Sequence, residues 1–182
     1  MTLQLFKWMM ALAIMLYLPL LFERVRGMRL KEGKHSDKYI KERVESIYFD
    51  VTHFYNGISG EAAGTPETWP DFDLLYCSDA WNEQVGKVTA EFFSCNYWTG
   101  HSELDFLYAN KVEVIDRTGD RATASLNLHN GDRCVPVLLV MMFERDDWRI
   151  DNMTYYWNEK PSTRFYDWRQ EMENSVNYQH NH

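Results

Sequence analysis

The sequence predicts an α+β domain in which helices pack on one face of an antiparallel sheet. Two observations carry this prediction. Apolar residues recur at helical spacing between residues 40 and 92, and residues 109–153 contain runs of strand length separated by short turns. Helices followed by consecutive strands are typical of a layered α+β fold.

Composition defines the broad class. A chain of 182 residues suffices for one domain with extensions, and 45% hydrophobic residues are ordinary for a globular core. The aromatic content of 15% indicates either a core of large rings or a pocket or interface lined by them. The net charge of −8 argues against a nucleic-acid partner, whose phosphates attract basic surfaces.

Residues 1–35 form a predicted hydrophobic signal or anchor segment and linker. The apolar run Trp8–Phe22 resembles a signal-peptide core. Counted from Leu3, the mainly apolar stretch is 20 residues long and would just span a bilayer as a helix. We therefore expect an exported protein, or one anchored with its domain on the periplasmic side, and membrane contact only through this segment. Basic residues after the run favour the alternative of a cytoplasmic-facing domain (Arg24, Arg26, Arg29 and Lys31). A start at Met28, which would leave the run untranslated, is a third alternative.

The first predicted helix ends at Asn56-Gly57, residues that tolerate the left-handed conformation of a helix C-terminus. Tyr48 and Tyr55 widen its apolar stripe, whose members alternate at spacings of four and three (Ile40, Val44, Ile47, Val51 and Phe54). A loop over Ser59–Pro70 follows, rich in Gly, Pro, Ser and Thr.

A second helix is predicted to begin at Ser78, a good N-cap, and to continue past Gly86. Its apolar face repeats by four, three and four (Trp81, Val85, Val88 and Phe92). A helix of about 15 residues is roughly 22 Å long, which separates Cys77 from Cys95 by more than a disulfide allows. Pairing of either cysteine with Cys134 stays open.

The predicted sheet follows, with turns at residues 118–120, 130–132 and 145–147. The unbroken apolar run Val135–Phe143 indicates a central strand covered on both faces. In the last strand, alternation places Trp148 and Ile150 on one face, and Arg149 and Asp151 on the other.

Residues 36–154 form the predicted domain, and residues 155–182 an aromatic C-terminal extension. In this extension Ser162 is an N-cap candidate, and Phe165, Trp168 and Met172 repeat at helical spacing. We expect a short helix there, either over the mouth of the domain or against exposed sheet, and a disordered end over 174–182.

Several stretches in this order resemble the NTF2-like superfamily of cone-shaped α+β folds. They are most similar to uncharacterised exported domains of Bacteroides-type bacteria (DUF3828-like), and the resemblance covers roughly residues 37–153. The matching stretches are Val51–Asn56, Asp71-Phe72-Asp73 to Ser78, Ser102–Phe106 and Trp148–Met153.

The resemblance implies a curved sheet wrapped around the N-terminal helices, with a cavity open at one end. Some members use this cavity for isomerase, dehydratase or epoxide hydrolase chemistry, and others bind ligands or dimerise. In isomerase-type members a pocket carboxylate and a tyrosine transfer protons. Asp105 and Asp151 stand at family-like acidic positions, and Tyr55 is the candidate tyrosine.

The sequence has no recognisable acid–base set, no Gly-x-Ser-x-Gly nucleophile motif and no Cys or His residues at metal-site spacing. We therefore expect no catalytic residues, metal or cofactor. Four residues are candidates for ligand binding: Tyr55, Trp81, Asp105 and Asp151. For Asp105 the alternative role is to cap the turn before the next strand, and for Asp151 it is a structural hydrogen bond.

The expected function is a non-enzymatic extracytoplasmic domain that binds a small ligand or another protein, with a homodimer through its sheet as one form. The alternative is a small-molecule isomerase or dehydratase that uses a pocket carboxylate. That alternative requires Asp105 or Asp151 to lie in an open pocket beside a tyrosine or histidine. A third interpretation is an immunity or adaptor protein.

Overall fold

The computed structural model describes residues 33–58, 70–88, 97–99, 105–159 and 162–180. The chain divides into two compact units, Met1–Tyr39 and Ile40–His182. In the first unit, Ser36 Oγ accepts a hydrogen bond from the Tyr39 backbone N–H at 3.2 Å, as the N-cap of a helix does. The predicted apolar run Trp8–Phe22 lies outside the described residues. All that follows concerns the second unit and the helix that leads into it.

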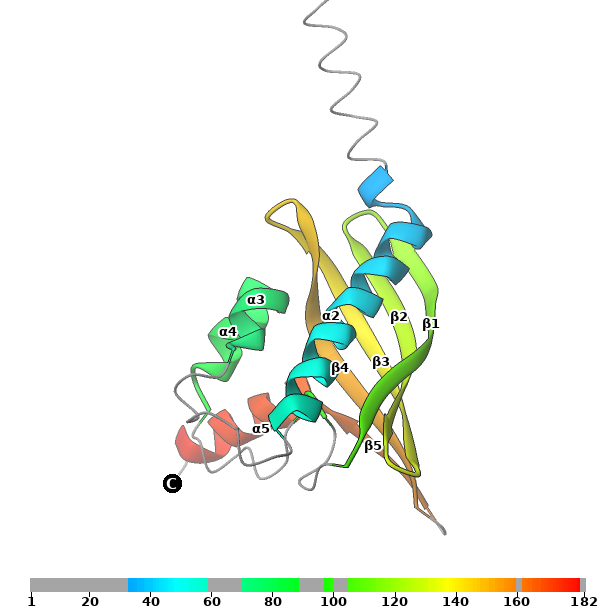
Figure 1. Cartoon of the computed structure of the whole chain (residues 1–182). Helices are drawn as coiled ribbons and strands as arrows, with labels where there is room; N and C mark the ends of the chain where they lie inside the picture. The colour runs from blue at the N-terminus through cyan, green and yellow to red at the C-terminus, as the bar shows by residue number, and fades with distance from the viewer. Residues whose placement is uncertain (1–32, 59–69, 89–96, 100–104, 160–161, 181–182) are drawn as a thin grey trace, which may run out of the picture. The chain divides into compact units, whose positions relative to one another are not determined.

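The described elements are four helices and five strands. In chain order they are α2 (Asp37–Ile58), α3 (Phe72–Tyr76), α4 (Asp79–Val85), β1 (Leu107–Thr118), β2 (Arg121–Asn130), β3 (Arg133–Glu144), β4 (Asp147–Glu159), β5 (Ser162–Asp167) and α5 (Trp168–His180). Each strand pairs antiparallel with its neighbour in sequence, so the sheet order is β1-β2-β3-β4-β5 (Figure 1). The predicted α+β class and the three predicted turns are confirmed. Among the described helices, none combines the length and apolar character that crossing a bilayer requires.

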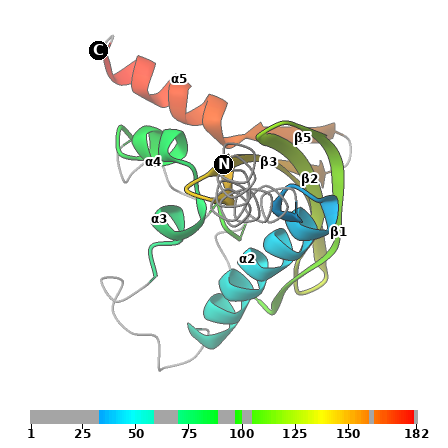
Figure 2. The same ribbon diagram turned by 90° about the horizontal axis from the view of Figure 1, so that it is seen from above.

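Helix α2 buries the apolar stripe that its spacing predicted. Ile40, Val44, Ile47 and Val51 are fully buried, and so is Tyr48 beside them. Seen from above, the sheet curves and α2 lies on its inner side (Figure 2). The helix therefore supplies one layer of the core and the sheet supplies the other.

Strand β3 lies at the centre of the sheet, as predicted, but it is not covered on both faces. Val135, Val137, Leu139 and Met141 are buried, while the residues that alternate with them are exposed or half-buried. The helices cover one face only, so the apolar run here fills the core with every second side chain.

Helix α4 begins where predicted and ends much earlier. Ser78 Oγ caps it by accepting from the Trp81 N–H at 3.0 Å, but the helix stops at Val85 with Gly86 as its C-cap. The glycine predicted in the middle of a helix therefore ends one. Because α4 ends at Val85, a long helix no longer separates Cys77 from Cys95, and the predicted reason against a bridge between them does not apply. Cys77 is a buried free thiol and Cys134 an exposed one, whereas Cys95 lies outside the described residues.

Strand β4 carries a β-bulge at Asp151. Met141 of β3 pairs with Ile150, but the next residue of β3 toward its N-terminus, Val140, pairs with Asn152. Because the extra residue reverses the alternation, Trp148 and Ile150 are buried before the bulge, and Asp151 itself is buried after it. After the bulge the buried apolar residues are Met153 and Tyr155, so the simple alternation predicted for this strand ends at Asp151.

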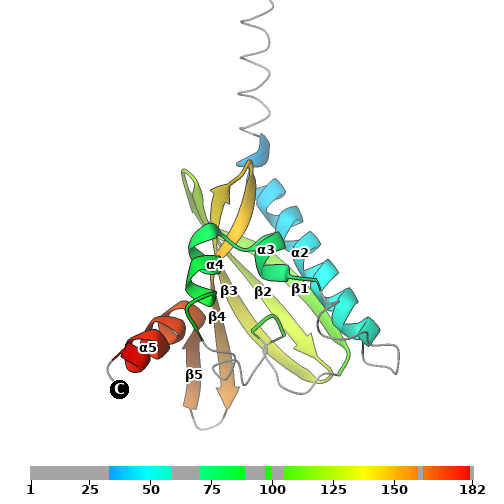
Figure 3. The same cartoon turned by 90° about the vertical axis from the view of Figure 1, so that its left-hand side faces the viewer.

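The C-terminal residues complete the sheet instead of extending from it. Ser162 begins β5, which pairs with β4, so the predicted helix start there is wrong. Helix α5 begins at Trp168 and runs to His180, so the predicted disorder from Asn174 is wrong as well. Trp168 and Met172, two of the three residues at helical spacing, are buried on this helix. Figure 3 shows α3 and α4 between α2 and α5, in front of the strands.

Candidate functional site

A pocket of about 340 Å³ opens beside α3, between this short helix, the end of α2 and the segment around residues 97–98. Its lining residues are Tyr55, Pro70, Asp71, Phe72, Asp73, Tyr97 and Trp98. The volume is at the lower end of the range of small-molecule sites, about 300–1,000 Å³. Four of the lining side chains are aromatic, so part of the high aromatic content of the chain lies in the wall of this pocket.

Asp73 supplies a half-buried acid to this pocket. The Tyr97 hydroxyl donates to its Oδ2, and the Trp98 indole Nε1 donates to its Oδ1 at 3.0 Å. Burial raises the pKa of the Asp73 carboxyl above its ordinary value of 3.8, and the charge of Asp71 adds to this rise. The hydrogen bonds from Tyr97 and Trp98 stabilise the carboxylate and offset only part of the increase in pKa.

The start of α3 positions both acids. Asp71 is the N-cap of this helix and accepts from the Leu74 N–H at 3.0 Å, while Asp73 is the second residue within the helix. The segment that carries the donors is held by the sheet, because the Tyr155 hydroxyl of β4 donates to the carbonyl of Tyr97. Burial and the nearby Asp73 charge raise the pKa of the Tyr97 phenol, so this side chain stays a neutral donor.

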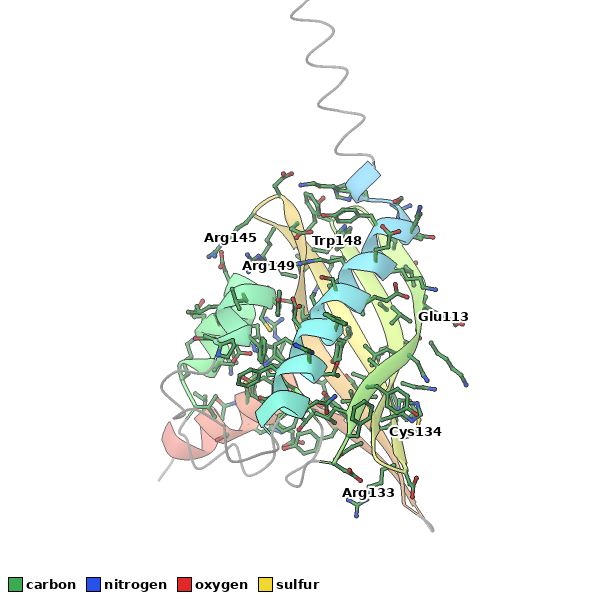
Figure 4. The ribbon with its side chains drawn as sticks, in the orientation of Figure 1. Glu113, Arg133, Cys134, Arg145, Trp148 and Arg149 are labelled. Atoms are coloured by element: carbon green, nitrogen blue, oxygen red, sulfur yellow. The ribbon has the colours of Figure 1, made fainter. Side chains whose placement is uncertain are left out.

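Cys77 lies behind the pocket at the end of α3. Its Sγ is 3.8 Å from Asp73 Oδ1, and burial raises the pKa of the thiol well above 9.0. The Arg149 guanidinium reaches from β4 toward α3, where it donates to the backbone carbonyls of Leu74, Leu75 and Cys77 (Figure 4). Arg149 therefore holds the C-terminal end of α3 in place with its charge directed at the backbone.

Of the four predicted ligand-binding residues, the structure brings Tyr55 into the pocket wall. Trp81 is 1% exposed and packs on Tyr97 with 5.6 Å between ring centroids. It supports the pocket from behind and is not among the lining residues.

Asp105 is exposed and lies in the turn before β1. Its Oδ1 accepts from the Phe106 N–H at 2.8 Å, and its backbone N–H donates to Asn130 Oδ1 at 2.6 Å. The residue therefore caps a turn, as in the alternative role given above, and the catalytic alternative loses this acid.

Asp151 is buried, but it is bound by structural partners. Ser78 Oγ donates to its Oδ1 at 2.7 Å, and Arg169 and Arg121 bind its Oδ2 at 2.8 Å and 3.3 Å. It joins α4, β2, β4 and α5 and does not line the pocket. Neither predicted acid thus meets the condition of an open pocket beside a tyrosine.

Asp73, Tyr97 and Trp98 are the pocket residues that sequence reasoning missed as a site. The stretch Asp71-Phe72-Asp73 contributed only to the family resemblance. The available signal was local: two acids flank an aromatic residue a few positions before the predicted N-cap Ser78, and an adjacent Tyr-Trp pair begins 24 residues after Asp73. Nothing in the spacing links these two signals, because tertiary packing alone brings them together.

Within the described ranges, no three or more His, Cys, Asp or Glu side chains gather closely enough to hold a metal ion. Comparison of the chain with protein-family models, curated proteins and solved structures finds no match. The pocket beside α3 is therefore the candidate functional site.

Proposed function

We propose that this domain binds a small organic molecule in the pocket beside α3, without chemical conversion. The observation that carries this proposal is a half-buried carboxylate, which two neutral donors hold in one orientation within an aromatic-walled pocket. Aromatic walls with a few fixed polar groups are typical of small-ligand sites. The proposed ligand-binding residues are now Tyr55, Asp73, Tyr97 and Trp98. Asp105 and Asp151 are no longer among them, because they do not line the pocket.

An NTF2-like architecture is part of the same proposal. It is supported by an amphipathic helix on the inner side of a curved antiparallel sheet, with a pocket next to that helix. The location outside the cytoplasm is supported by the apolar run Trp8–Phe22 in the sequence. A homodimer through the sheet is supported by the exposed side chains of Tyr108 and Ile115 on β1. Light scattering of the purified protein tests the dimer, and monomers at all concentrations would contradict it.

The Trp98 indole offers a specific test of binding, because its N–H donates to Asp73 inside the pocket. A fragment library of neutral, cationic and anionic molecules is titrated while the indole N–H resonances are followed by NMR. We expect ligands to shift the Trp98 resonance and to leave the Trp148 resonance unchanged. Trp148 is fully buried and does not line the pocket. A library in which nothing shifts Trp98 selectively contradicts the proposal.

A second candidate function is proton transfer of the isomerase or dehydratase type, with Asp73 as the pocket carboxylate. The specific observation in its favour is the Tyr97–Asp73 hydrogen bond together with the raised pKa of Asp73. Solvent deuterium incorporation into small ketones, followed by NMR, tests this function. Incorporation by the wild type that is lost in Asp73→Asn would support catalysis, and equal rates in both proteins would contradict it.

A further inference from the structure

The wall of the pocket is a connected set of aromatic rings. Phe72 contacts Tyr55 and Trp98, with ring centroids 6.1 Å and 5.8 Å apart, and Tyr97 contacts Trp98 at 6.2 Å. The faces of such rings carry partial negative charge and attract cations.

The charged side chains that line the pocket are both acidic. Asp71 is exposed, whereas Asp73 is half-buried and accepts only from neutral groups, the phenol of Tyr97, the indole of Trp98 and the thiol of Cys77. In the described part of the chain, neither acid forms an ion pair with Lys, Arg or His. The nearby Arg149 is directed at backbone carbonyls instead. The pocket therefore holds negative charge that the described residues do not neutralise.

We propose that the ligand of this pocket is an organic cation, a small molecule whose ammonium group lies against the aromatic rings with Asp71 and Asp73 as counter-charges. This inference rests on the proposed small-ligand function and specifies its ligand class. A carboxylate in a low-dielectric site attracts a cation more strongly than one in water does, and the ring faces add to this attraction. Anionic molecules meet two like charges in the same space and are excluded.

The charge of the whole chain favours the same class. A net charge of −8 raises the local concentration of small cations and speeds their association. A volume of about 340 Å³ admits a molecule of the size of choline with room for a larger apolar body.

Choline and its uncharged isostere 3,3-dimethylbutan-1-ol form the matched probe pair, because they differ in charge and little in shape. Each is titrated into the full chain while the Trp98 indole resonance is followed by NMR. We expect choline to bind at least about tenfold more tightly than the alcohol. We also expect this preference to shrink in Asp73→Asn and Asp71→Asn, and to survive in the control Glu45→Gln on α2. Since Asp71 is exposed, its variant keeps the test valid if Asp73→Asn does not fold.

The outcomes separate the two proposals. Equal affinities, or binding of neutral fragments without choline, overturn the cation inference and leave the small-ligand function standing. A Trp98 resonance that no fragment of any charge shifts overturns both. A choline preference that persists in both Asp variants also overturns the inference, because the carboxylates would then not be the counter-charges.

Discussion

Arg169 of α5 donates a hydrogen bond to Asp151 of β4, with 2.8 Å between Nη1 and Oδ2. The Asp151 side chain is 6% exposed, and Ser78 and Arg121 bind the same carboxylate. Because Asp151 is buried while Arg169 and Arg121 are 34% and 63% exposed, the carboxylate depends on these partners more than they depend on it. The contact is therefore expected to hold the last helix to the sheet.

Asp151→Ala is expected to lower the free energy of unfolding by about 1–3 kcal/mol, mainly because the buried Ser78 hydroxyl loses its acceptor. Urea denaturation followed by circular dichroism measures this change. The control is Glu45→Gln, which removes an exposed pair with Lys41 and is expected to cost below about 0.5 kcal/mol. Similar small costs for both variants would contradict a structural role for Asp151.

Two glycines with the same backbone conformation allow a matched test of the turn at Asp105. Gly119 and Gly131 have φ values of 60° and 58°, but a Cβ at Gly119 meets open space, whereas one at Gly131 meets the Asp105 carboxylate. Gly119→Ala is expected to cost about 1–2 kcal/mol from conformation alone, and Gly131→Ala more. In an Asp105→Ala background the cost of Gly131→Ala is expected to fall toward that of Gly119→Ala. Thermal unfolding of the four variants checks this, and an unchanged cost would show that Asp105 does not crowd the turn.

The raised pKa of Asp73 predicts a distinct pH dependence of stability. The folded protein holds this proton more tightly than the unfolded chain, so the stability from Asp73 is fully present below the ordinary pKa of 3.8 and is lost as pH rises through the folded value. The facing groups are Asp71, which adds to the rise, the donors Tyr97 and Trp98, and the thiol of Cys77. We expect the stability of the wild type minus that of Asp73→Asn to fall with rising pH over this window. Urea denaturation from pH 3 to 8 measures it, and a difference that rises with pH would show that the carboxylate is favoured in the fold.

The two described cysteines are expected to differ sharply in reactivity. Cys134 is exposed on β3, on the part of the sheet away from α3 and α4 (Figure 4), whereas Cys77 is buried with a raised thiol pKa. Because the thiolate is the reactive form, iodoacetamide should modify Cys134 in the native protein and Cys77 only after unfolding. Peptide mapping by mass spectrometry distinguishes the sites. Equal modification in the native state would mean that α3 opens readily.

The helix and turn signals that rest on local chemistry predicted structure well. The stripe from Ile40 to Val51 and the N-cap at Ser78 depend on residues close in sequence, and both are confirmed. Ser162 shows the limit of such signals, because the same N-cap chemistry stands at the start of a strand once β4 offers hydrogen bonds.

The site was harder to predict because its parts meet only through packing. The bulge at Asp151 reverses which residues of β4 face the core, and alternation alone cannot show where an extra residue falls. Asp73 was not predicted as a site residue since its donors, Tyr97 and Trp98, lie 24 and 25 residues away along the chain. A family resemblance directed attention to acids at Asp105 and Asp151, which the fold uses for a turn and an ion pair.

The nearest-neighbour order of the strands has a consequence for biosynthesis. Every pairing in the sheet joins consecutive strands, so each hairpin can close as soon as its second strand leaves the ribosome. Helix α2 is translated before the sheet that it packs against. Its apolar stripe, which is buried in the folded domain, is therefore accessible to chaperones until β2 and β3 have emerged. The contact of Asp151 with Arg169 forms last, so until α5 has been synthesised the Asp151 carboxylate has only Ser78 and Arg121 as partners, and Arg169 completes its neutralisation.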